Sequence, residues 1–136
     1  MLVFALSGYG NFSIWHKDSD LYSVNLETGD VSCMNPINSD DVESYHSWSS
    51  DSRWLAFSSR RDDGLYTKPY FAYVDSDGNA HKPFLLPQRN PKRYYDSHMY
   101  AFNIPELVYG KVEFKGSEIA DFARNGVVEK VKCKRR

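Results

Sequence analysis

Histidine and acidic side chains are the residues of this chain whose types could hold a metal ion. The four histidines are His16, His46, His81 and His98. No two of them are three or four residues apart, so a single helix face cannot present a metal-binding pair. Asp75, Asp77 and Asn79 imitate the start of a calcium-binding loop. That loop needs glycine where Ala80 stands and a bidentate glutamate where Leu86 stands, so we expect a turn, no metal and no cofactor.

The serines, glycines and cysteines of the chain do not form the motifs that catalytic nucleophiles or phosphate-binding loops need. The serine elbow of hydrolases needs glycines two residues to either side, and Ser7 has Ala5 at one of these positions. Gly8 and Gly10 lack the third glycine and the lysine of a phosphate-binding loop. Cys33 and Cys133 lie in unrelated settings and form no C-x-x-C motif, so we expect two free thiols. The sequence indicates a protein that is not an enzyme.

Composition excludes further classes. Among 136 residues there are 3 Trp, 10 Tyr and 8 Phe. Burial of so much ring surface can offset the entropy lost on folding, so the composition excludes a mainly disordered chain. A net charge of -1 argues against a general binder of nucleic acid, and the basic residues after residue 129 are expected to form a solvated tail. The apolar run Met1–Leu6 is too short to span a membrane and lacks the features of a secretory signal. A natural start at Met1 would therefore indicate a cytoplasmic product.

The apolar pattern predicts short strands separated by turns. We expect them over residues 2–7, 12–15, 21–26, 31–34, 45–48, 54–59, 70–74 and 83–87. Residues 2–7 align with 54–59 at an offset of 52, residues 21–24 with 71–74 at 50, and Gly29 with Gly78 at 49. A repeated four-stranded antiparallel unit is typical of a β-propeller. The predicted fold is all-β and mainly antiparallel, with two propeller-like blades that form an incomplete propeller; an eight-stranded β-sandwich is the alternative.

The rest of the chain differs from the repeats. We expect residues 1–89 to form the two repeats, about 1–38 and 39–89, and residues 90–136 to pack on them as an extension. Residues 90–104 read as a loop across the blades. Residues 117–124 predict a short helix, with Ser117 as its N-cap and Gly126 as a left-handed stop, followed by a strand over 127–131.

Candidate binding residues are chosen for expected exposure and chemistry. The charged hairpin loop contributes Arg60, Arg61, Asp62 and Asp63, and the first loop contributes Tyr9, Trp15 and His16. Aromatic residues are concentrated at 9–15 and 94–102. Flat rings of this kind stack on sugars and peptides, although in repeat proteins most rings fill the space between blades.

One segment resembles a known repeat. Residues 49–59, Ser-Ser-Asp-Ser-Arg-Trp-Leu-Ala-Phe-Ser-Ser, are similar to the S-P-D-G-K-x-L-A-F-S-S motif of TolB-like propellers, the WD40-like PD40 repeat. The chain departs from it at Ser50 and Ser52, where proline and glycine are usual. Residues 75–78 look like the family's D-x-D-G hairpin, and residues 10–15 and 103–107 resemble the C-terminal end of larger TolB-like proteins from Bacteroides-type bacteria. The resemblance covers about residues 1–110 and implies a periplasmic, non-catalytic propeller that binds other proteins.

Two repeats are too few for a closed ring, because propellers need about four blades of about 40 residues each. We expect either the C-terminal piece of a longer propeller or several copies that assemble to cover open sheet edges. The preferred function is a protein–protein interaction module of the bacterial cell envelope. The alternatives are the propeller part of a prolyl-oligopeptidase-like hydrolase and a carbohydrate-binding envelope protein.

Overall fold

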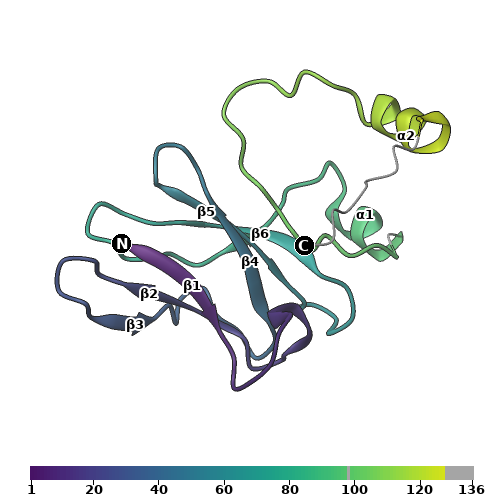
Figure 1. Cartoon of the computed structure of the whole chain (residues 1–136). Coiled ribbons are helices and arrows are strands. Elements are labelled where there is room, and N and C mark those ends of the chain that lie inside the picture. The colour runs from purple at the N-terminus through teal and green to yellow at the C-terminus, as the bar shows by residue number, and fades with distance from the viewer. Residues whose placement is uncertain (98, 128–136) are drawn as a thin grey trace, which may run out of the picture.

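The computed structural model describes residues 1–97 and 99–127, and its first sheet has three antiparallel strands. They are β1 (Leu2–Leu6), β2 (Asp20–Val24) and β3 (Val31–Cys33), in the spatial order β1-β2-β3 (Figure 1). The turn between β2 and β3 contains Gly29 at φ 80°, a left-handed conformation that glycine adopts without steric cost. The N-terminal third of the chain is therefore a small meander.

The second sheet has four antiparallel strands in sequence order. They are β4 (Glu43–Trp48), β5 (Trp54–Ser59), β6 (Lys68–Tyr73) and β7 (Phe84–Leu85). Strand β5 coincides with the apolar run predicted from sequence. Strand β7 is an edge strand with prolines on both sides, as expected, because proline cannot donate to a ladder. Both sheets together confirm the all-β, mainly antiparallel fold class.

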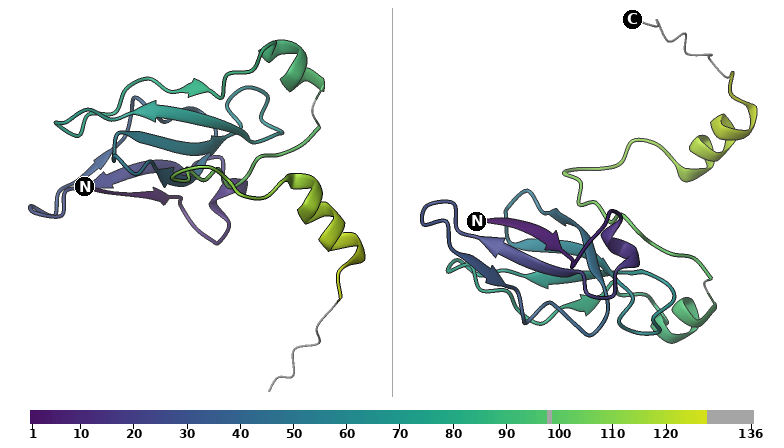
Figure 2. Two further views of the ribbon diagram at one scale, coloured as in Figure 1. Left: turned by 90° about the horizontal axis from the view of Figure 1, so that it is seen from above. Right: turned by 60° about the horizontal axis from the view of Figure 1, so that its bottom comes forward.

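The hydrophobic core lies between the two sheets, which Figure 2 shows as two layers. The segment 1–38 contributes Val3, Leu21, Met34 and Ile37, and the second sheet contributes Leu55, Phe57, Tyr70 and Ala72. In strands β5 and β6 the registers Leu55↔Ala72 and Phe57↔Tyr70 place these four side chains on one face. Every second residue of β5 and β6 consequently faces away from the core.

The first sheet lacks the fourth strand expected over residues 12–15. These residues instead form a 3-10 helix, η1 (Ser13–Trp15), preceded by Gly10 at φ 83° and Phe12 at φ 58°. Two left-handed residues so close together bend the chain sharply, which is incompatible with an extended strand. The described residues form no closed propeller ring, and the first repeat has one strand fewer than the second.

Three strands of each sheet follow the same antiparallel order, but the strand pairing shifts the sequence alignment by one residue in β2. If Val3 corresponds to Leu55, the observed pairs Val3↔Ser23 and Leu55↔Ala72 make Ser23 the counterpart of Ala72, so the offset in this strand is 72 − 23 = 49. The sequence alignment assumed an offset of 50 residues. That offset would make Phe71, which faces outward, the counterpart of Leu21, which faces the core. A one-residue slip exchanges the two faces of a strand, so the pairing corrects the alignment.

The C-terminal region contains two helices, α1 (Pro91–Ser97) and α2 (Gly116–Asn125). The prediction of a loop over 90–104 was wrong at α1. At the start of this helix, the side-chain oxygen of Asn90 accepts a hydrogen bond from the N–H of Arg93. In α2 the N-cap is Lys115, not Ser117, and its N–H donates to the carboxylate of Glu118 at 3.0 Å. Gly126 follows α2 in an extended conformation, φ -68°, and not a left-handed one.

The helices differ in how they relate to the sheets. Tyr95 of α1 is buried, and its hydroxyl donates to the carbonyl of Leu86 at 2.8 Å. Helix α2 has no buried residue and lies beyond the sheets in Figures 1 and 2. The strand expected over 127–131 lies outside the described residues apart from Val127, as does Cys133, and the division into residues 1–89 and 90–136 stays a prediction.

Candidate interaction surface

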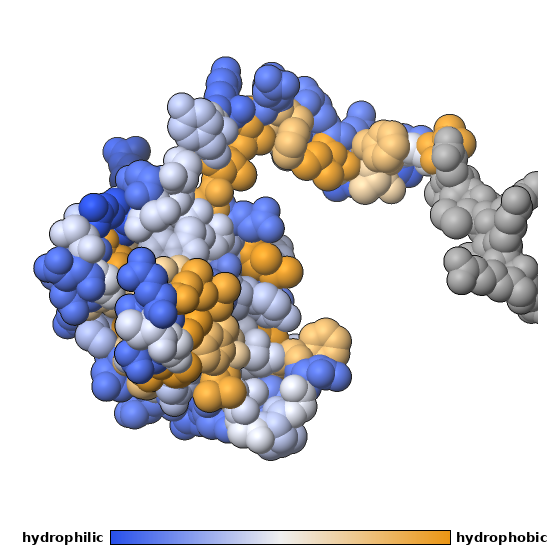
Figure 3. Space-filling model, turned by 60° about the vertical axis from the view of Figure 1, so that its left-hand side comes forward, coloured by the Kyte–Doolittle hydropathy of each residue, from blue (hydrophilic) through white to orange (hydrophobic). Residues whose placement is uncertain are grey.

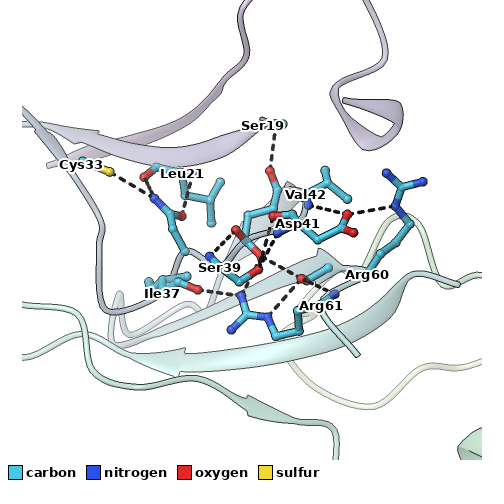
Figure 4. Close-up of polar contacts among 12 residues, drawn as sticks. Ser19, Leu21, Cys33, Ile37, Ser39, Asp41, Val42, Arg60 and Arg61 are labelled. Atoms are coloured by element: carbon cyan, nitrogen blue, oxygen red, sulfur yellow. Dashed lines mark hydrogen bonds and ion pairs between the residues drawn. The ribbon is translucent and has the colours of Figure 1, made fainter. Parts of the chain in front are cut away.

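A buried ion pair between Glu43 and Arg61 connects the loop before β4 to the second sheet (Figure 4). Glu43 is fully buried, and its carboxylate accepts hydrogen bonds from the N–H and hydroxyl of Ser39 at 2.9 and 2.6 Å and from the hydroxyl of Ser59 at 2.7 Å. The guanidinium of Arg61 donates to the same carboxylate at 2.8 Å and to the carbonyl of Ile37 at 2.6 Å. With four donors, this carboxylate has the hydrogen bonding that a structural charge needs.

Arg60 and Arg61 were chosen from sequence because the hairpin loop was expected to expose them, and that premise is wrong. The side chain of Arg61 is 18% exposed and its guanidinium lies 4.6 Å from the ring centre of Tyr70. The side chain of Arg60 is 14% exposed, and its Nε lies 3.4 Å from a carboxylate oxygen of Asp41. Sequence reasoning missed these partners because both acids lie about 20 residues earlier in the chain.

Asp62 and Asp63 are exposed residues that face the ammonium group of Lys68. The Nζ atom lies 3.2 Å from Asp62 and 3.0 Å from Asp63. Burial acts to lower the pKa of Lys68, but the hydrogen bonds and charges of the two carboxylates outweigh it and raise that pKa. Burial raises the pKa of Tyr70, and its hydrogen bond to Asp62 raises it further. Each charge therefore has an opposite charge beside it.

A cavity of about 490 Å³ opens between this hairpin and α1. Asp62, Asp63 and Lys68 lie on its wall, and Lys68 sits 5.7 Å from the ring centre of Tyr95. Apolar side chains complete the lining, among them Leu65, Tyr66, Leu85 and Met99. The arrangement is amphipathic, and its charged groups are engaged with one another.

The three candidates in the first loop lie at the surface or close to it. Tyr9 and Trp15 are exposed, and the rings of Tyr9 and His16 meet edge-to-face at 4.8 Å between centres. A ring nitrogen of His16 lies 3.1 Å from the carbonyl oxygen of Asn11. The structure thus brings Tyr9 and His16 together, while Asp62 and Asp63 belong to the separate hairpin.

The outer face of the second sheet carries aromatic residues that were not singled out from sequence. We define the outer aromatic face as Trp54, Phe71, Tyr73 and Phe84. The ring centre of Trp54 lies 5.3 Å from that of Tyr73 and 6.0 Å from that of Phe84. Phe71 stacks on Phe84 with 6.0 Å between their ring centres. Trp54 and Tyr73 are 38% exposed and Phe84 is 44% exposed. The sequence could have indicated this face, because residues 54–57 are apolar on both sides of the strand: Trp54 and Ala56 alternate with Leu55 and Phe57.

Part of this same face is covered by the chain itself. The hydroxyl of Ser58 donates to the carbonyls of Phe102 and Asn103 at 2.7 and 2.8 Å. The N–H of Leu107 donates to the hydroxyl of Ser47 at 3.1 Å. A cavity of about 260 Å³, lined by Ala56, Pro69, Phe71, Leu86 and residues 102–107, lies along this contact. The face therefore accommodates an extended stretch of polypeptide beside its exposed rings.

Apolar residues are also exposed elsewhere. Figure 3 shows them both on the body of the sheets and along the segment that leads to α2. That segment and helix include Val108, Val112, Phe114, Ile119 and Phe122, all exposed. On the first sheet, Phe4 stacks on Tyr22 at 6.0 Å on the face turned away from the core, with Leu2 and Leu6 exposed beside them.

Metal and membrane features were sought within residues 1–97 and 99–127. No cluster of three or more His, Cys, Asp or Glu in this part of the chain could hold a metal ion, and His98 lies outside it. No helix of the described chain is long and apolar enough to cross a membrane. Cys33 is a free thiol, 3.3 Å from the side-chain amide nitrogen of Asn38.

Comparisons with known proteins found no match among protein-family models, curated proteins or solved structures. The TolB-like resemblance therefore stays an expectation that rests on the motifs alone. What the fold defines is an all-β protein of two packed antiparallel sheets, with its buried charges paired and aromatic rings exposed on an outer sheet face.

Proposed function

We propose that this chain is a non-catalytic module that binds another protein through the outer aromatic face of its second sheet. The observation that carries the proposal is the exposure of Trp54, Tyr73 and Phe84 side by side on three neighbouring strands, β5, β6 and β7. Large aromatic residues dominate the binding energy of protein interfaces. A contiguous set of them on a sheet is a typical sign of an interaction site.

The contact with residues 102–107 supports an extended or sheet-like partner. Ser47 and Ser58 already bind backbone groups of this segment on the same face. The opposite face of the sheet packs against another sheet, through Leu55 and Phe57. We propose that the partner is a protein that lays a β-strand or sheet surface over the rings, with apolar side chains toward Trp54.

The polar residues favour binding over catalysis. The carboxylate of Glu43 accepts four hydrogen bonds, and Lys68 is paired with two carboxylates. Acid–base chemistry needs a group that is available to exchange a proton with a substrate. We propose the cell envelope as the place of action and a TolB-like protein as the relative; both parts rest on the sequence motifs.

Affinity capture with matched variants tests the proposal. Trp54→Ser with Phe84→Ser removes two exposed rings, and Leu65→Ser, the control, removes an even more exposed apolar side chain from the hairpin loop. A partner captured by the unchanged chain should be identified by mass spectrometry, purified and titrated. The double variant should bind it about 30-fold or more weakly, since interface hot spots contribute about 2 kcal/mol or more, whereas Leu65→Ser should bind normally. Equal binding by all three chains would reject the proposed face.

A further inference from the structure

The edges of the two sheets are protected in different ways. Strand β3 has only three residues and β7 only two. Strand β4 is irregular, with a register shift between Ser44 and Ser47 and with Tyr45 at φ 46°. Short strands, bulges and flanking prolines are the means by which proteins prevent unwanted pairing at sheet edges. These three edges are therefore poor templates for another strand.

Strand β1 has none of these protections. It pairs with β2 in unbroken register from Leu2 to Leu6, and its sequence Leu-Val-Phe-Ala-Leu contains no charge and no proline. Within the described residues no strand pairs with its other edge. A regular, apolar and uncharged edge strand is a template for strand addition.

The internal repeat shows what belongs beside β1. Strands β1, β2 and β3 correspond to β5, β6 and β7, and β5 carries β4 on its remaining edge. Strand β4 contributes Trp48, which packs on the core between the sheets. The position beside β1 thus corresponds to a strand that runs antiparallel to it and directs an apolar residue toward the core.

The hydrogen bonds of β2 identify the backbone groups on the open edge of β1. The N–H of Leu21 donates to the side-chain oxygen of Asn38 and its C=O accepts from the N–H of Met34, so the backbone of Leu21 faces β3 and not β1. In an antiparallel sheet, alternate residues direct their N–H and C=O groups to the same side. Since Leu21 and Ser23 lie opposite Ala5 and Val3, the register assigns Val3 and Ala5 to the open edge, and Leu2, Phe4 and Leu6 to the ladder with β2.

We propose that β1 is a strand-addition site, at which an extended strand of another protein pairs antiparallel with residues 2–6 and gives the first sheet a fourth strand. This inference rests on the proposed function in one respect, that the chain binds proteins, but it uses a different surface. The incoming strand forms its hydrogen bonds with the backbone groups of Val3 and Ala5. We expect the incoming strand to carry apolar residues at alternate positions, because the side chains of β1 beside it are apolar on both faces of the sheet.

A peptide that copies residues 41–50, with a scrambled peptide as control, provides the probe. Amide hydrogen exchange should slow at least tenfold at Val3 and Ala5 when the β4-like peptide is added, and remain unchanged at Phe4, whose N–H already belongs to the β2 ladder. Ala5→Pro removes an N–H that β2 does not use and should abolish peptide binding, while Ala5→Val should retain it. Since Ala5→Pro could also unfold the chain, the exchange map of the unchanged chain is the deciding measurement.

Three outcomes have distinct meanings. Protection of Val3 and Ala5 by the peptide but not by the scrambled control supports the proposal. Absence of protection at saturating peptide would overturn it. If light scattering shows that the chain is a dimer with Val3 and Ala5 already protected, the occupant is a second copy, and the assignment to another protein is wrong. Trp54→Ser should bind the peptide normally, so a failure of the outer aromatic face and a failure of the β1 edge are distinguishable.

Discussion

The guanidinium of Arg61 lies 2.8 Å from the fully buried carboxylate of Glu43. The same group bonds the carbonyl of Ile37, while the backbone N–H of Glu43 donates to the carbonyl of Ser19 at 2.7 Å. This ion pair therefore ties three parts of the chain together: the approach to β2, the loop before β4, and the end of β5. Together with the bond to Ser19, the ion pair holds the second sheet beside the segments that flank the first sheet.

Replacing Arg61 by methionine should destabilise the protein by about 3 kcal/mol or more. The change leaves the carboxylate of Glu43 buried without its counter-charge, which is the costly way to break such a pair. Lys111→Met, at an exposed position, is the matched control and should change the free energy of unfolding by less than about 0.5 kcal/mol. Urea unfolding measures both. Similar values for the two variants would mean that the ion pair does not hold the sheets together.

Stability should fall as pH decreases below the ordinary histidine value of 6.5, and His46 should account for part of the loss. Burial lowers the pKa of His46, an effect only partly opposed by its hydrogen bond with Val3. The unfolded chain then binds this proton at a higher pH than the folded chain, so folding is penalised between 6.5 and the lower folded value. His46→Gln should reduce the difference between unfolding free energies at pH 7.5 and 5.5. An unchanged difference would show that His46 is not the responsible group.

Gly29→Ala should destabilise the protein by about 1 kcal/mol, although a methyl group there meets no atom within 4 Å. The cost comes from the backbone, because φ 80° is a left-handed conformation that disfavours a Cβ atom. Gly116→Ala is the matched control, since its surroundings are also open and its φ is not left-handed. A thermal melt of each variant measures the effect. An equal melting temperature for both would contradict the backbone explanation.

Sequence patterns found the strands whose signals are local. Strand β5 is bounded by a turn on each side and is apolar on both faces, so its limits were predictable. The repeat was visible too, but only the pairing of Val3 with Ser23 and of Leu55 with Ala72 fixes its register. An offset of 49 or 50 gives an equally convincing alignment of apolar letters, whereas a difference of one residue reverses the face.

The other errors have physical causes as well. Residues 12–15 alternate like a strand, but Phe12 adopts φ 58° and starts a 3-10 helix. Asn90 and Pro91 are a good helix start, because asparagine caps and proline suits the first position, and that signal was overlooked. Arg61 looked exposed because Glu43, its partner, is 18 residues away in sequence. Long-range ion pairs of this kind have no local signature.

Site-specific photo-crosslinking tests the central claim, that the outer aromatic face binds another protein. A photoreactive phenylalanine analogue is introduced at Phe84, on the face, or at Leu65, on the hairpin loop, in chains exposed to an extract of the producing cells. We predict one adduct of defined mass from position 84, lost when Trp54→Ser is added, and none of that mass from position 65. The same adduct from both positions, or none from position 84, would contradict the account.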